Sequence, residues 1–568
     1  MAGSVPISSG TSLALACAEL PEQENAKAAE TDLWIFRDGR TAVSGREMLR
    51  DLARRISQDA SQSLVDSLIQ AGELEAAVCD LGSRDGAVCE LTDTLASLLY
   101  SGKTSADPAH IVQRITVPDS LSISAPEGFT YYALHPLDFA RLASRIPITP
   151  QACAVVGIRS IGTTLSAMTT AALKATGRPV SRITVRPTGH PYARSTSFSA
   201  EQIRWILDQV SRPAQFLVVD EGPGRSGSTF LSVAEALVAA GVQRDAVTIL
   251  GSRGFDPGSL CAQDAADRWR GLRFFHTVPC VNTRFENCLY VGGGEWRKFI
   301  VNEPGAWPES WTQMERLKFL SPDRKTFFKF EGMGPSGADV RERAFTLADA
   351  GFSPTVADAG DGFLAYDMLN GKRLQIEDVS QSLLEQFARY CAFRLSELPA
   401  PQSEPAELRQ MLEFNVRQEF GRELTLDESE LIPRNPALAD GRMQPYEWIM
   451  AADGRLVKAD AISHGDNHFF PGPCDIAWDL AGAAVEWTLD PGALNFLVAR
   501  FRDYSGKDAS KQLTAYMLAY SVFRLGFCKM AISTVLGTDE EGRLRSAYLH
   551  YRALASRLLD AGDCLNQK

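Results

Sequence analysis

The strongest constraint on the fold lies between residues 150 and 256, where short apolar runs alternate with amphipathic segments. The apolar runs read ACAVVGI, SRITV, QFLVVD and AVTILGS, and two of the segments between them read SIGTTLSAMTTAALKATG and SGSTFLSVAEALVAAGV. Uninterrupted apolar runs are typical of strands buried on both faces, and helical crossovers join parallel strands. The pattern therefore predicts an α/β fold with a doubly wound parallel sheet.

The chain is too long for one hydrophobic core, since it has 568 residues. Residues 1–30 are rich in Ala, Ser and Glu and are predicted to be a disordered tail. Apolar spacing of three and four from about 45 to 100 predicts a helical extension, so the first domain is expected to span 31–275. Beyond 285, KTFFKFEG and GFLAYDML indicate strands of a smaller sheet, and the last hundred residues are mostly helical in pattern. We expect a second, α+β domain over 285–568.

Composition limits the partners of this chain. The net charge of -12 disfavours general nucleic-acid binding, and no apolar run is long enough to span a membrane. The eleven cysteines are scattered singly, without a C-x-x-C pair, and the N-terminus lacks the basic residues of a signal peptide. We expect a cytoplasmic protein that acts on small molecules, with no nucleic-acid or membrane partner; whether it forms a homodimer stays open.

The stretch FLVVDEGPGRSGST, residues 216–229, carries the first candidate site. An apolar strand ends in Asp220 and Glu221, and ligands of parallel α/β sheets bind beyond the carboxyl ends of the strands. The loop after the acids is rich in Gly and Ser, so it can present N–H groups and hydroxyls to a phosphate at the start of a helix. The two acids suit ribose hydroxyls or a Mg2+ ion that bridges to a pyrophosphate.

This arrangement resembles the PRPP-binding motif of type I phosphoribosyltransferases. Upstream, VVGIRSIGTTLS is similar to the pyrophosphate loop of that family, and SRITVRPTGHPYARSTSF stands in the place of its flexible catalytic loop. The resemblance covers roughly residues 125–260. It implies that Mg2+ and PRPP bind here and that a nitrogen base or similar nucleophile attacks C1′ with loss of pyrophosphate. The loop departs from the family in being one residue longer, with Gly-Pro-Gly after the acids.

The resemblance also implies a role for each matching residue. Asp220 and Glu221 would be the catalytic pair that binds the ribose hydroxyls and the metal. The other implied ligands are Gly224, Arg225, Ser226, Gly227, Ser228 and Thr229 for the 5′-phosphate, Arg159, Ser160 and Gly162 for pyrophosphate, and Arg186, His190, Tyr192 and Arg194 in the closing loop. Two plainer interpretations stay open: a Gly-rich turn that binds nothing, and basic residues that are solvated surface charges.

The second half of the chain holds another candidate site. Lys329 lies on the apolar strand KTFFKFEG, Glu342 lies on a predicted helix, and Asp460 follows a hairpin, WIMAADGRLVKADA, that Asp-Gly turns. Together with DIAWDLAG, which contains Asp475 and Asp479, these residues resemble protein-kinase-like folds of the aminoglycoside phosphotransferase type. The resemblance implies that Lys329 and Glu342 pair to hold the phosphates of ATP, that Asp460 binds Mg2+, and that the domain is a phosphotransferase.

The predicted catalytic loop departs from that family. In place of its His-Gly-Asp, with Asn five residues later, stands ADGRMQPYEW: Arg442 takes the Asp position, Asp440 lies two residues earlier and Glu447 takes the Asn position. Either Asp440, Glu447, Asp460 and Asp466 share the catalytic and metal-binding work, or catalysis has been lost. The segment HGDNH also offers His464, Asp466 and His468 as metal ligands, with a polar loop braced by hydrogen bonds as the alternative.

Two functions follow from these patterns. The first is an enzyme that transfers a phosphoribosyl group from PRPP to a base or small nucleophile, coupled to ATP-dependent phosphorylation of a small molecule by the second domain. The alternative is a regulatory protein without catalysis, in which a domain that senses PRPP or a nucleotide is fused to a pseudokinase-like domain that binds a partner.

Overall fold

The computed structural model describes residues 40–566, apart from 59–60, 83–85, 105, 148–151, 191, 302, 401–405, 425, 463, 465–469 and 471–473. The tail predicted over 1–30 lies outside the described residues. The described chain divides into two compact units. The first holds Arg40–Glu286 and Gly332–Ala338, and the second holds Asn287–Glu331 and Asp339–Lys568. None of the helices in the described part combines the length and hydropathy that crossing a bilayer requires.

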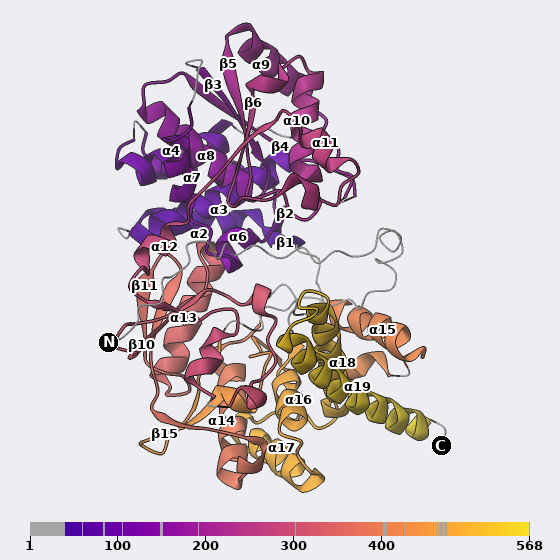
Figure 1. The fold of residues 1–568 in the computed structure, drawn as a ribbon. Coiled ribbons are helices and arrows are strands. Elements are labelled where there is room, and N and C mark those ends of the chain that lie inside the picture. Colours follow the sequence, from indigo (N-terminus) through magenta and orange to yellow (C-terminus); the bar gives the residue numbers. More distant parts are fainter. Residues whose placement is uncertain are drawn as a thin grey trace, which may run out of the picture. The chain divides into compact units, whose positions relative to one another are not determined.

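A five-stranded parallel sheet is the centre of the first unit (Figure 1). Its strand order is β4-β3-β5-β6-β7, and every neighbouring pair is parallel. The strands are β3 (Ala152–Ile158), β4 (Val180–Val185), β5 (Ala214–Val219), β6 (Val247–Gly251) and β7 (Arg273–His276). The predicted parallel sheet is confirmed, whereas its assignment to the phosphoribosyltransferase fold stays a prediction. From β3 the chain passes first to β4 on one side and then to β5 on the other, so the strand order reverses between β3 and β5.

Helices cover both faces of this sheet. In Figure 1, α4, α7 and α8 lie to the left of the strands, and α9, α10 and α11 lie to their right. On the second face Phe230 of α10 packs edge-on against Trp269 of α11, with ring centroids 6.3 Å apart. The bounds are α4 (Gly86–Ser101), α7 (Pro136–Ala143), α8 (Ile161–Ala175), α9 (Ala200–Ser211), α10 (Ser228–Ala239) and α11 (Ala265–Trp269).

The helical extension is attached to the sheet by a buried ion pair. Arg182 of β4 donates to both carboxylate oxygens of Glu75, at 2.8 and 2.9 Å, and to Asp93 at 2.8 Å. The bidentate pair supplies acceptors for guanidinium N–H groups that burial has removed from water. The remaining elements of the first unit are β1 (Arg40–Ser44), α2 (Gly45–Ile56), α3 (Ser61–Asp80), α5 (Pro108–Val112), β2 (Ser120–Ser124), α6 (Glu127–Tyr131) and α12 (Cys280–Arg284).

The second unit begins with a small antiparallel sheet of order β11-β12-β10-β9-β8. Its strands are β8 (Leu289–Tyr290), β9 (Lys318–Leu320), β10 (Thr326–Phe330), β11 (Val356–Gly360) and β12 (Phe363–Asp367). Two smaller sheets follow, made of β13 (Gly371–Arg373), β15 (Trp448–Ala451) and β16 (Leu456–Lys458), and of β14 (Pro436–Ala437) and β17 (Cys474–Asp475). The hairpin expected at Asp-Gly is formed by β15 and β16, and Gly454 turns it with a φ of 86°.

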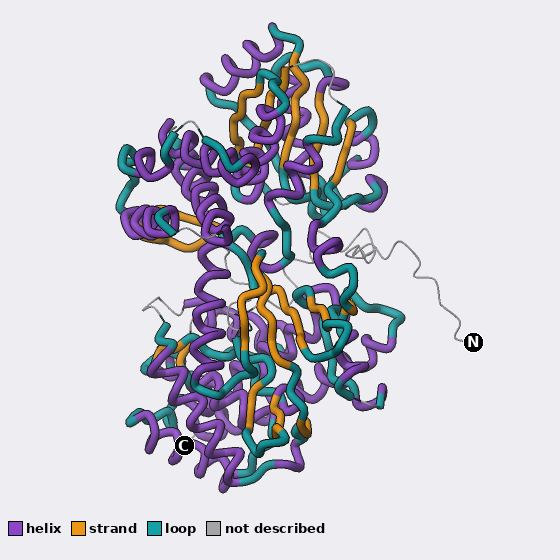
Figure 2. Tube along the Cα trace, turned by 90° about the vertical axis from the view of Figure 1, so that its left-hand side faces the viewer, coloured by secondary structure: helices purple, strands orange, loops and turns teal. Residues whose placement is uncertain are grey.

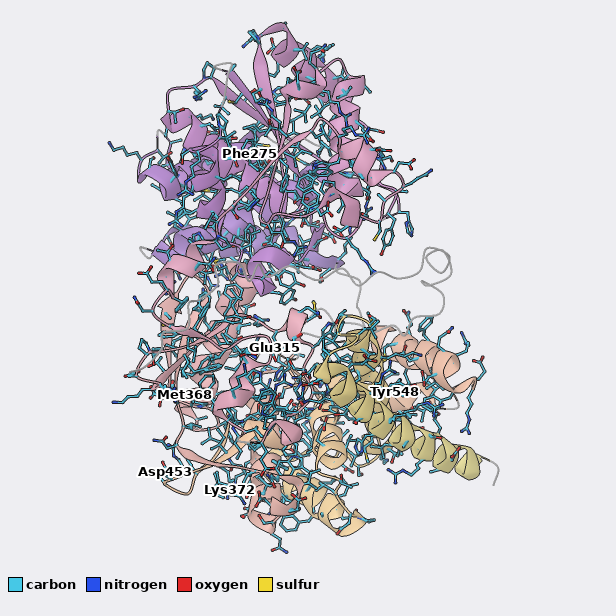
Figure 3. All side chains as sticks on the ribbon, viewed as in Figure 1. Phe275, Glu315, Met368, Lys372, Asp453 and Tyr548 are labelled. Carbon is cyan, nitrogen blue, oxygen red and sulfur yellow. The ribbon has the colours of Figure 1, made fainter. Side chains whose placement is uncertain are left out.

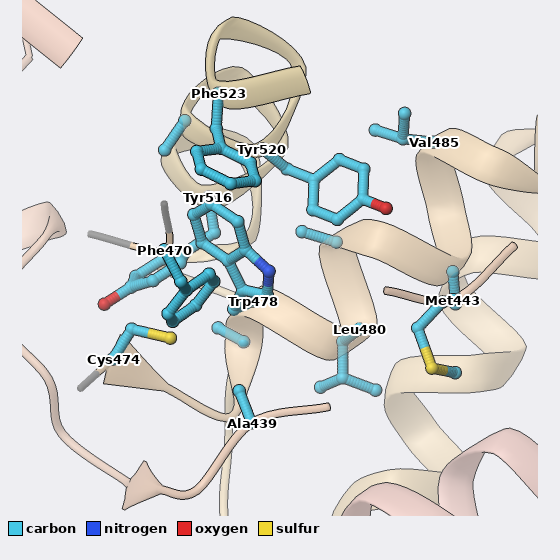
Figure 4. Packing of buried hydrophobic residues seen from close by; sticks show 14 of the residues in the cluster. Ala439, Met443, Phe470, Cys474, Trp478, Leu480, Val485, Tyr516, Tyr520 and Phe523 are labelled. Carbon is cyan, nitrogen blue, oxygen red and sulfur yellow. The ribbon is translucent and has the colours of Figure 1, made fainter. Parts of the chain in front are cut away.

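Helices make up most of the rest of the second unit, as Figure 2 shows in purple. They are α13 (Gly334–Asp349), which begins in the segment counted with the first unit, α14 (Gln381–Glu397), α15 (Ala406–Phe420), α16 (Ala477–Glu486), α17 (Pro491–Ser505), α18 (Leu513–Ile532) and α19 (Asp539–Asn566). Their core is aromatic. Trp478 of α16 packs edge-on against Phe470 and Phe523, with centroids 4.9 and 5.6 Å apart (Figure 4).

Candidate functional site

A cavity of about 200 Å³ lies within the second unit. Its lining includes residues of β9, of β10, such as Lys329, and of the end of β12, together with Met368 just after β12 and residues of the segment before β15 and of the chain after β16. Glu315 and Met368, which both line the cavity, are labelled in Figure 3. Apolar and charged side chains share the lining, which is typical of a site for a small polar molecule.

Lys329 and Asp460 meet in the wall of this cavity. The Lys329 side chain is buried, and its Nζ lies 2.8 Å from Oδ1 of Asp460 and 3.0 Å from Oε1 of Glu331. Burial alone would lower the pKa of Lys329, but the charges of Asp460 and Glu331 raise it above its ordinary value. Likewise, burial opposes ionisation of Asp460, yet Lys329 and His464 hold the pKa of that carboxyl well below its usual range. The lysine and the acid are therefore both charged.

The helix glutamate expected beside Lys329 lies elsewhere. Glu342 is exposed on α13, whereas Glu331, two positions after Lys329, is buried next to the ammonium. Glu331 also accepts a hydrogen bond from the hydroxyl of Tyr366 at 3.1 Å. The alternation of a strand places residues i and i+2 on one face, and this period was the available signal for Glu331.

Asp440 is completely buried behind the cavity rather than in its lining. Its carboxylate accepts hydrogen bonds from the Tyr390 hydroxyl at 2.5 Å and from Lys458 Nζ at 3.3 Å. Although burial opposes ionisation, Lys458, His464 and Arg394 hold the pKa of Asp440 below its ordinary value. Asp440 is thus an anion that acts on its neighbours, without direct access to a ligand in the cavity.

The two aspartates of DIAWDLAG brace the loop that carries Asp440. The carboxylate of Asp479 accepts the backbone N–H groups of Asp440 and Gly441, at 2.8 and 3.0 Å. Asp475 accepts the N–H groups of Arg434 and Asn435, at 2.7 and 2.6 Å. Burial raises the pKa of Asp479 to about 6, and the nearby charge of Asp440 adds to this. These contacts fix the loop backbone, because each buried N–H receives a charged acceptor.

His464 and Lys458 complete the cluster; the sequence offered His464 as a metal ligand of the HGDNH segment, whereas Lys458 was not predicted. His464 Nδ1 lies 3.5 Å from Asp440, and Nε2 lies 3.5 Å from Asp460 and 3.8 Å from Glu447. Lys458 Nζ donates to Glu447 at 2.7 Å and to the main-chain oxygen of Asp460 at 2.5 Å. Their signal in the sequence was proximity to Asp460. The predicted ligands Asp466 and His468 lie outside the described residues.

The fit of a divalent cation differs between two positions of this cluster. Lys329 contacts Oδ1 of Asp460, but this carboxylate lines the cavity and is partly exposed, so its Oδ2 suits a cation that also contacts a ligand there. Asp440, Glu447 and His464 offer ligand atoms within 4.8 Å of one another, but the Lys458 ammonium already contacts both carboxylates. The residues therefore fit an ion at Asp460 and do not fit a second one between Asp440 and Glu447.

In the first unit, Asp220 and Glu221 lie where the strand order reverses, at the end of β5 next to the end of β3. Asp220 accepts backbone N–H groups from Glu221 and Gly162, and burial raises its pKa to about 7. Burial, with the charge of Asp220 added, raises the pKa of Glu221 to about 8, which Arg253 opposes. Such a pair of acids is poised to take up a cation or hydroxyl donors.

The loop after β3 approaches these acids closely. A Cβ on Gly162 would lie 2.5 Å from the carbonyl oxygen of Val219, so only glycine allows this approach. Ser160, just before α8, has a φ of 95°, a conformation that costs of order 1–3 kcal/mol in a residue with a side chain. The segment predicted to bind pyrophosphate is therefore a strained turn beside Asp220.

The segment predicted to bind the 5′-phosphate forms the turn into α10. Gly224 and Gly227 have φ values of 60° and 71°, which glycine adopts without strain. Ser226 Oγ lies 2.9 Å from Ser228 Oγ and accepts the backbone N–H of Ser228 at 3.2 Å. Arg225 is exposed, and Thr229 is partly buried in the first turn of the helix.

The basic residues expected to hold pyrophosphate are tied to an acid that the sequence did not reveal. Asp80, at the end of α3, lies 3.1 Å from Arg159 and 2.6 Å from Arg186. Arg186 still opposes the rise in the pKa of Asp220, so it acts on the acid pair. In the loop after β4, His190 stacks on Tyr192 with centroids 5.6 Å apart, and Arg194 donates to Gly189 at 2.6 Å.

Comparison with known proteins adds little to this geometry. No protein-family model matches the sequence, and no curated protein matches it significantly. Among solved structures, choline kinase LicA from Streptococcus pneumoniae is 13% identical, with 43% of this chain and 89% of that chain covered and a TM-score of 0.30. A choline/ethanolamine kinase family protein from Mesorhizobium loti is 16% identical, with 47% of this chain and 98% of that chain covered and a TM-score of 0.29. The GDP complex of aminoglycoside 2'-phosphotransferase-IIIa is 17% identical, with 42% of this chain and 89% of that chain covered and a TM-score of 0.28. Since each TM-score is below 0.5, no property of these proteins is carried over to this chain.

Proposed function

We propose that the second unit binds a nucleoside triphosphate with Mg2+ and transfers its terminal phosphoryl group to a small molecule. The observation that carries this proposal is the Lys329–Asp460 pair, 2.8 Å apart in the wall of the cavity. Phosphoryl transfer depends on positioning and on neutralising phosphate charge, for which an ammonium and a metal-holding carboxylate side by side are suited. The apolar lining by Phe327, Met368 and Ile462 suits a planar base.

Each side chain of the cluster has a role in this proposal. Lys329 contacts the phosphates, and Asp460 is the carboxylate that would hold Mg2+, which supplies positive charge at the phosphate oxygens. His464 lines the cavity and accepts the proton of the attacking hydroxyl at Nε2. Asp440, 3.5 Å from Nδ1, orients the imidazole and acts through it. This assignment differs from the predicted sharing of the work among Asp440, Glu447, Asp460 and Asp466, because His464 is the base and Asp440 does not touch the substrate.

Nucleotide binding and turnover are tested separately. Thermal shift with ATP and Mg2+ should stabilise wild type, and Lys329→Ala should abolish the shift, whereas Lys372→Ala, which changes an exposed lysine paired with Asp378, should retain it. Asp460→Asn should abolish ATP consumption in a small-molecule extract. A wild type that shows neither a thermal shift nor ATP consumption refutes the proposal for this unit.

As a second candidate function, we infer that the first unit binds PRPP with Mg2+ and transfers its phosphoribosyl group to a nitrogen nucleophile. The specific observation is that Asp220 and Glu221, with pKa values raised to about 7 and about 8, lie at the reversal of the strand order. Burial and mutual repulsion disfavour the ionised forms of this acid pair, and Mg2+ or ribose hydroxyls would stabilise those forms. The turn into α10 supplies N–H groups for a phosphate.

Isothermal titration of PRPP in the presence of Mg2+ tests this second function. Asp220→Asn with Glu221→Gln should abolish the heat of binding, while Asp208→Asn, which changes an exposed acid on α9, should leave it unchanged. Undiminished binding by the double variant refutes the assignment. Release of pyrophosphate in a metabolite extract indicates an enzyme, and tight binding without turnover favours the regulatory alternative.

A further inference from the structure

Lys458, the last residue of β16, has a completely buried side chain that contacts three residues of the cluster. Its Nζ lies 2.7 Å from Oε2 of Glu447, 3.3 and 3.2 Å from Oδ1 and Oδ2 of Asp440, and 2.5 Å from the main-chain oxygen of Asp460. An ammonium has three N–H donors and no acceptor, so these three residues satisfy it. The residues that surround Lys458 are therefore a binding site for a cation.

The charge of Lys458 is maintained by its partners. A buried amine without an anion would lose its proton, since the free-energy cost of desolvating an isolated charge is large. Here the carboxylates of Asp440 and Glu447 lie 3.2 and 2.7 Å from Nζ and supply the anions that a buried ammonium requires. The ammonium and the carboxylate thus stabilise each other as ions.

The same cluster has the composition of a divalent metal site. Asp440, Glu447 and His464 offer two carboxylate oxygens and an imidazole nitrogen within 4.8 Å of one another. Carboxylate and imidazole ligands suit Mn2+, Mg2+ or Zn2+. A divalent ion between Asp440 and Glu447 would, however, stand against the Lys458 ammonium and compete for the same oxygens. One position cannot hold both cations.

We propose that Lys458 is the resident cation of this cluster and takes the position between Asp440 and Glu447 that a divalent ion would otherwise occupy. Lys458 is a positioning residue: it fixes Glu447 and, through the main-chain oxygen, the place from which the side chain of Asp460 extends to Lys329. The placement of Lys458 does not depend on the proposed phosphoryl transfer. One consequence does rest on that function: phosphoryl transfer at this site would use one divalent ion, held at Asp460.

Mn2+ counting by electron paramagnetic resonance on the full chain, without nucleotide, tests this assignment. Lys458→Ala should bind one more Mn2+ per chain than wild type, and adding Glu447→Gln to that variant should remove the extra ion. Lys372→Ala is the control, since Lys372 is an exposed lysine paired with Asp378 outside the cluster, and it should bind the wild-type number. A folded Lys458→Ala protein without the extra ion overturns the proposal.

A comparison that keeps Lys458 decides the question if Lys458→Ala does not fold. Glu447→Gln alone retains an acceptor oxygen for the ammonium. This variant should bind as many Mn2+ ions as wild type, because the Glu447 side chain binds the Lys458 ammonium rather than a metal. Loss of one ion in Glu447→Gln means that a metal displaces the lysine and refutes the proposal. Because no nucleotide is present, failure of ATP to bind would refute the phosphotransfer function and leave this result standing.

Discussion

Replacing Lys458 by Met should destabilise the second unit more than any surface substitution. Met keeps most of the aliphatic stem and removes the ammonium, so Asp440 and Glu447, 0% and 5% exposed, lose their shared cation. Removing one partner of a buried ion pair costs about 3–5 kcal/mol, because an uncompensated charge remains. Asp440 keeps the Tyr390 hydroxyl and the Arg394 charge, which places the expected loss near the lower end of that range.

The pH dependence of this loss follows from two pKa shifts. The pKa of Asp440 is lower in the folded than in the unfolded protein. Its contribution to the free energy of unfolding is therefore fully present above its unfolded pKa, about 4, and is lost as the pH falls through the lowered folded pKa. The pKa of Lys458 is higher in the folded than in the unfolded protein. Its contribution to the free energy of unfolding is therefore fully present below its unfolded pKa, about 10, and is lost as the pH rises through the raised folded pKa. The difference between wild type and Lys458→Met should therefore be flat from about pH 5 to 9 and shrink below pH 4.

Hydrogen exchange in the peptides of β15 and β16 measures this stability without interference from the first unit. Lys458→Met with Glu447→Gln should recover part of the loss, because the second change removes one uncompensated charge. Mn2+ at 100 times its Kd should recover about 2.7 kcal/mol in Lys458→Met, provided that it binds the folded state alone. The reasoning is refuted if Lys458→Met lowers the free energy of unfolding by less than about 1 kcal/mol at pH 7, or if that decrease grows as the pH falls to 4.

Four further outcomes are expected. Because the folded pKa of Asp220 is raised to about 7, wild type loses stability as pH rises from about 4 to 7, and Asp220→Asn should melt higher than wild type at pH 8 by calorimetry without ligand. Gly162→Ala should destabilise the first unit by about 1–3 kcal/mol in urea unfolding, because its Cβ meets the Val219 carbonyl. Asp479→Asn should loosen the loop at Asp440, seen as faster exchange of its N–H, since a charged acceptor is lost. Arg182→Gln should expose the helical extension to proteolysis, because Glu75 remains buried without a partner.

Local patterns in the sequence predicted the elements that carry the candidate sites. The apolar run before Asp220 predicted β5 of a parallel sheet, because a strand buried on both faces leaves no polar alternation. Asp-Gly predicted the β15–β16 hairpin, since glycine adopts the positive φ of the turn. Lys329 and Asp460 were predicted to share a site, and they are 2.8 Å apart. For β5 and the hairpin the signal was short and lay within one element, whereas Lys329 and Asp460 were linked through the family resemblance.

The partners of these side chains were not predictable in the same way. Asp80 binds Arg186 across 106 positions, a contact that depends on how the helical extension packs on the sheet. Glu342 was expected beside Lys329, whereas Glu331 takes that place, because the register of β10 rather than the helix brings an acid to the ammonium. The Asp80–Arg186 contact leaves no periodic or compositional trace, so only the tertiary packing identifies it, whereas the i, i+2 alternation of the strand was an available signal for Glu331.

Glu447 and Lys458 form a compensated pair of buried charges. Glu447 adds one negative charge to a buried cluster that already contains Asp440. Lys458 adds one positive charge at 2.7 Å from it. Either change alone would leave a buried ion without a partner, at a cost of several kcal/mol, whereas the two together are compensated. The two charges therefore depend on each other, and we expect a substitution at one residue to be tolerated only with a matching change at the other.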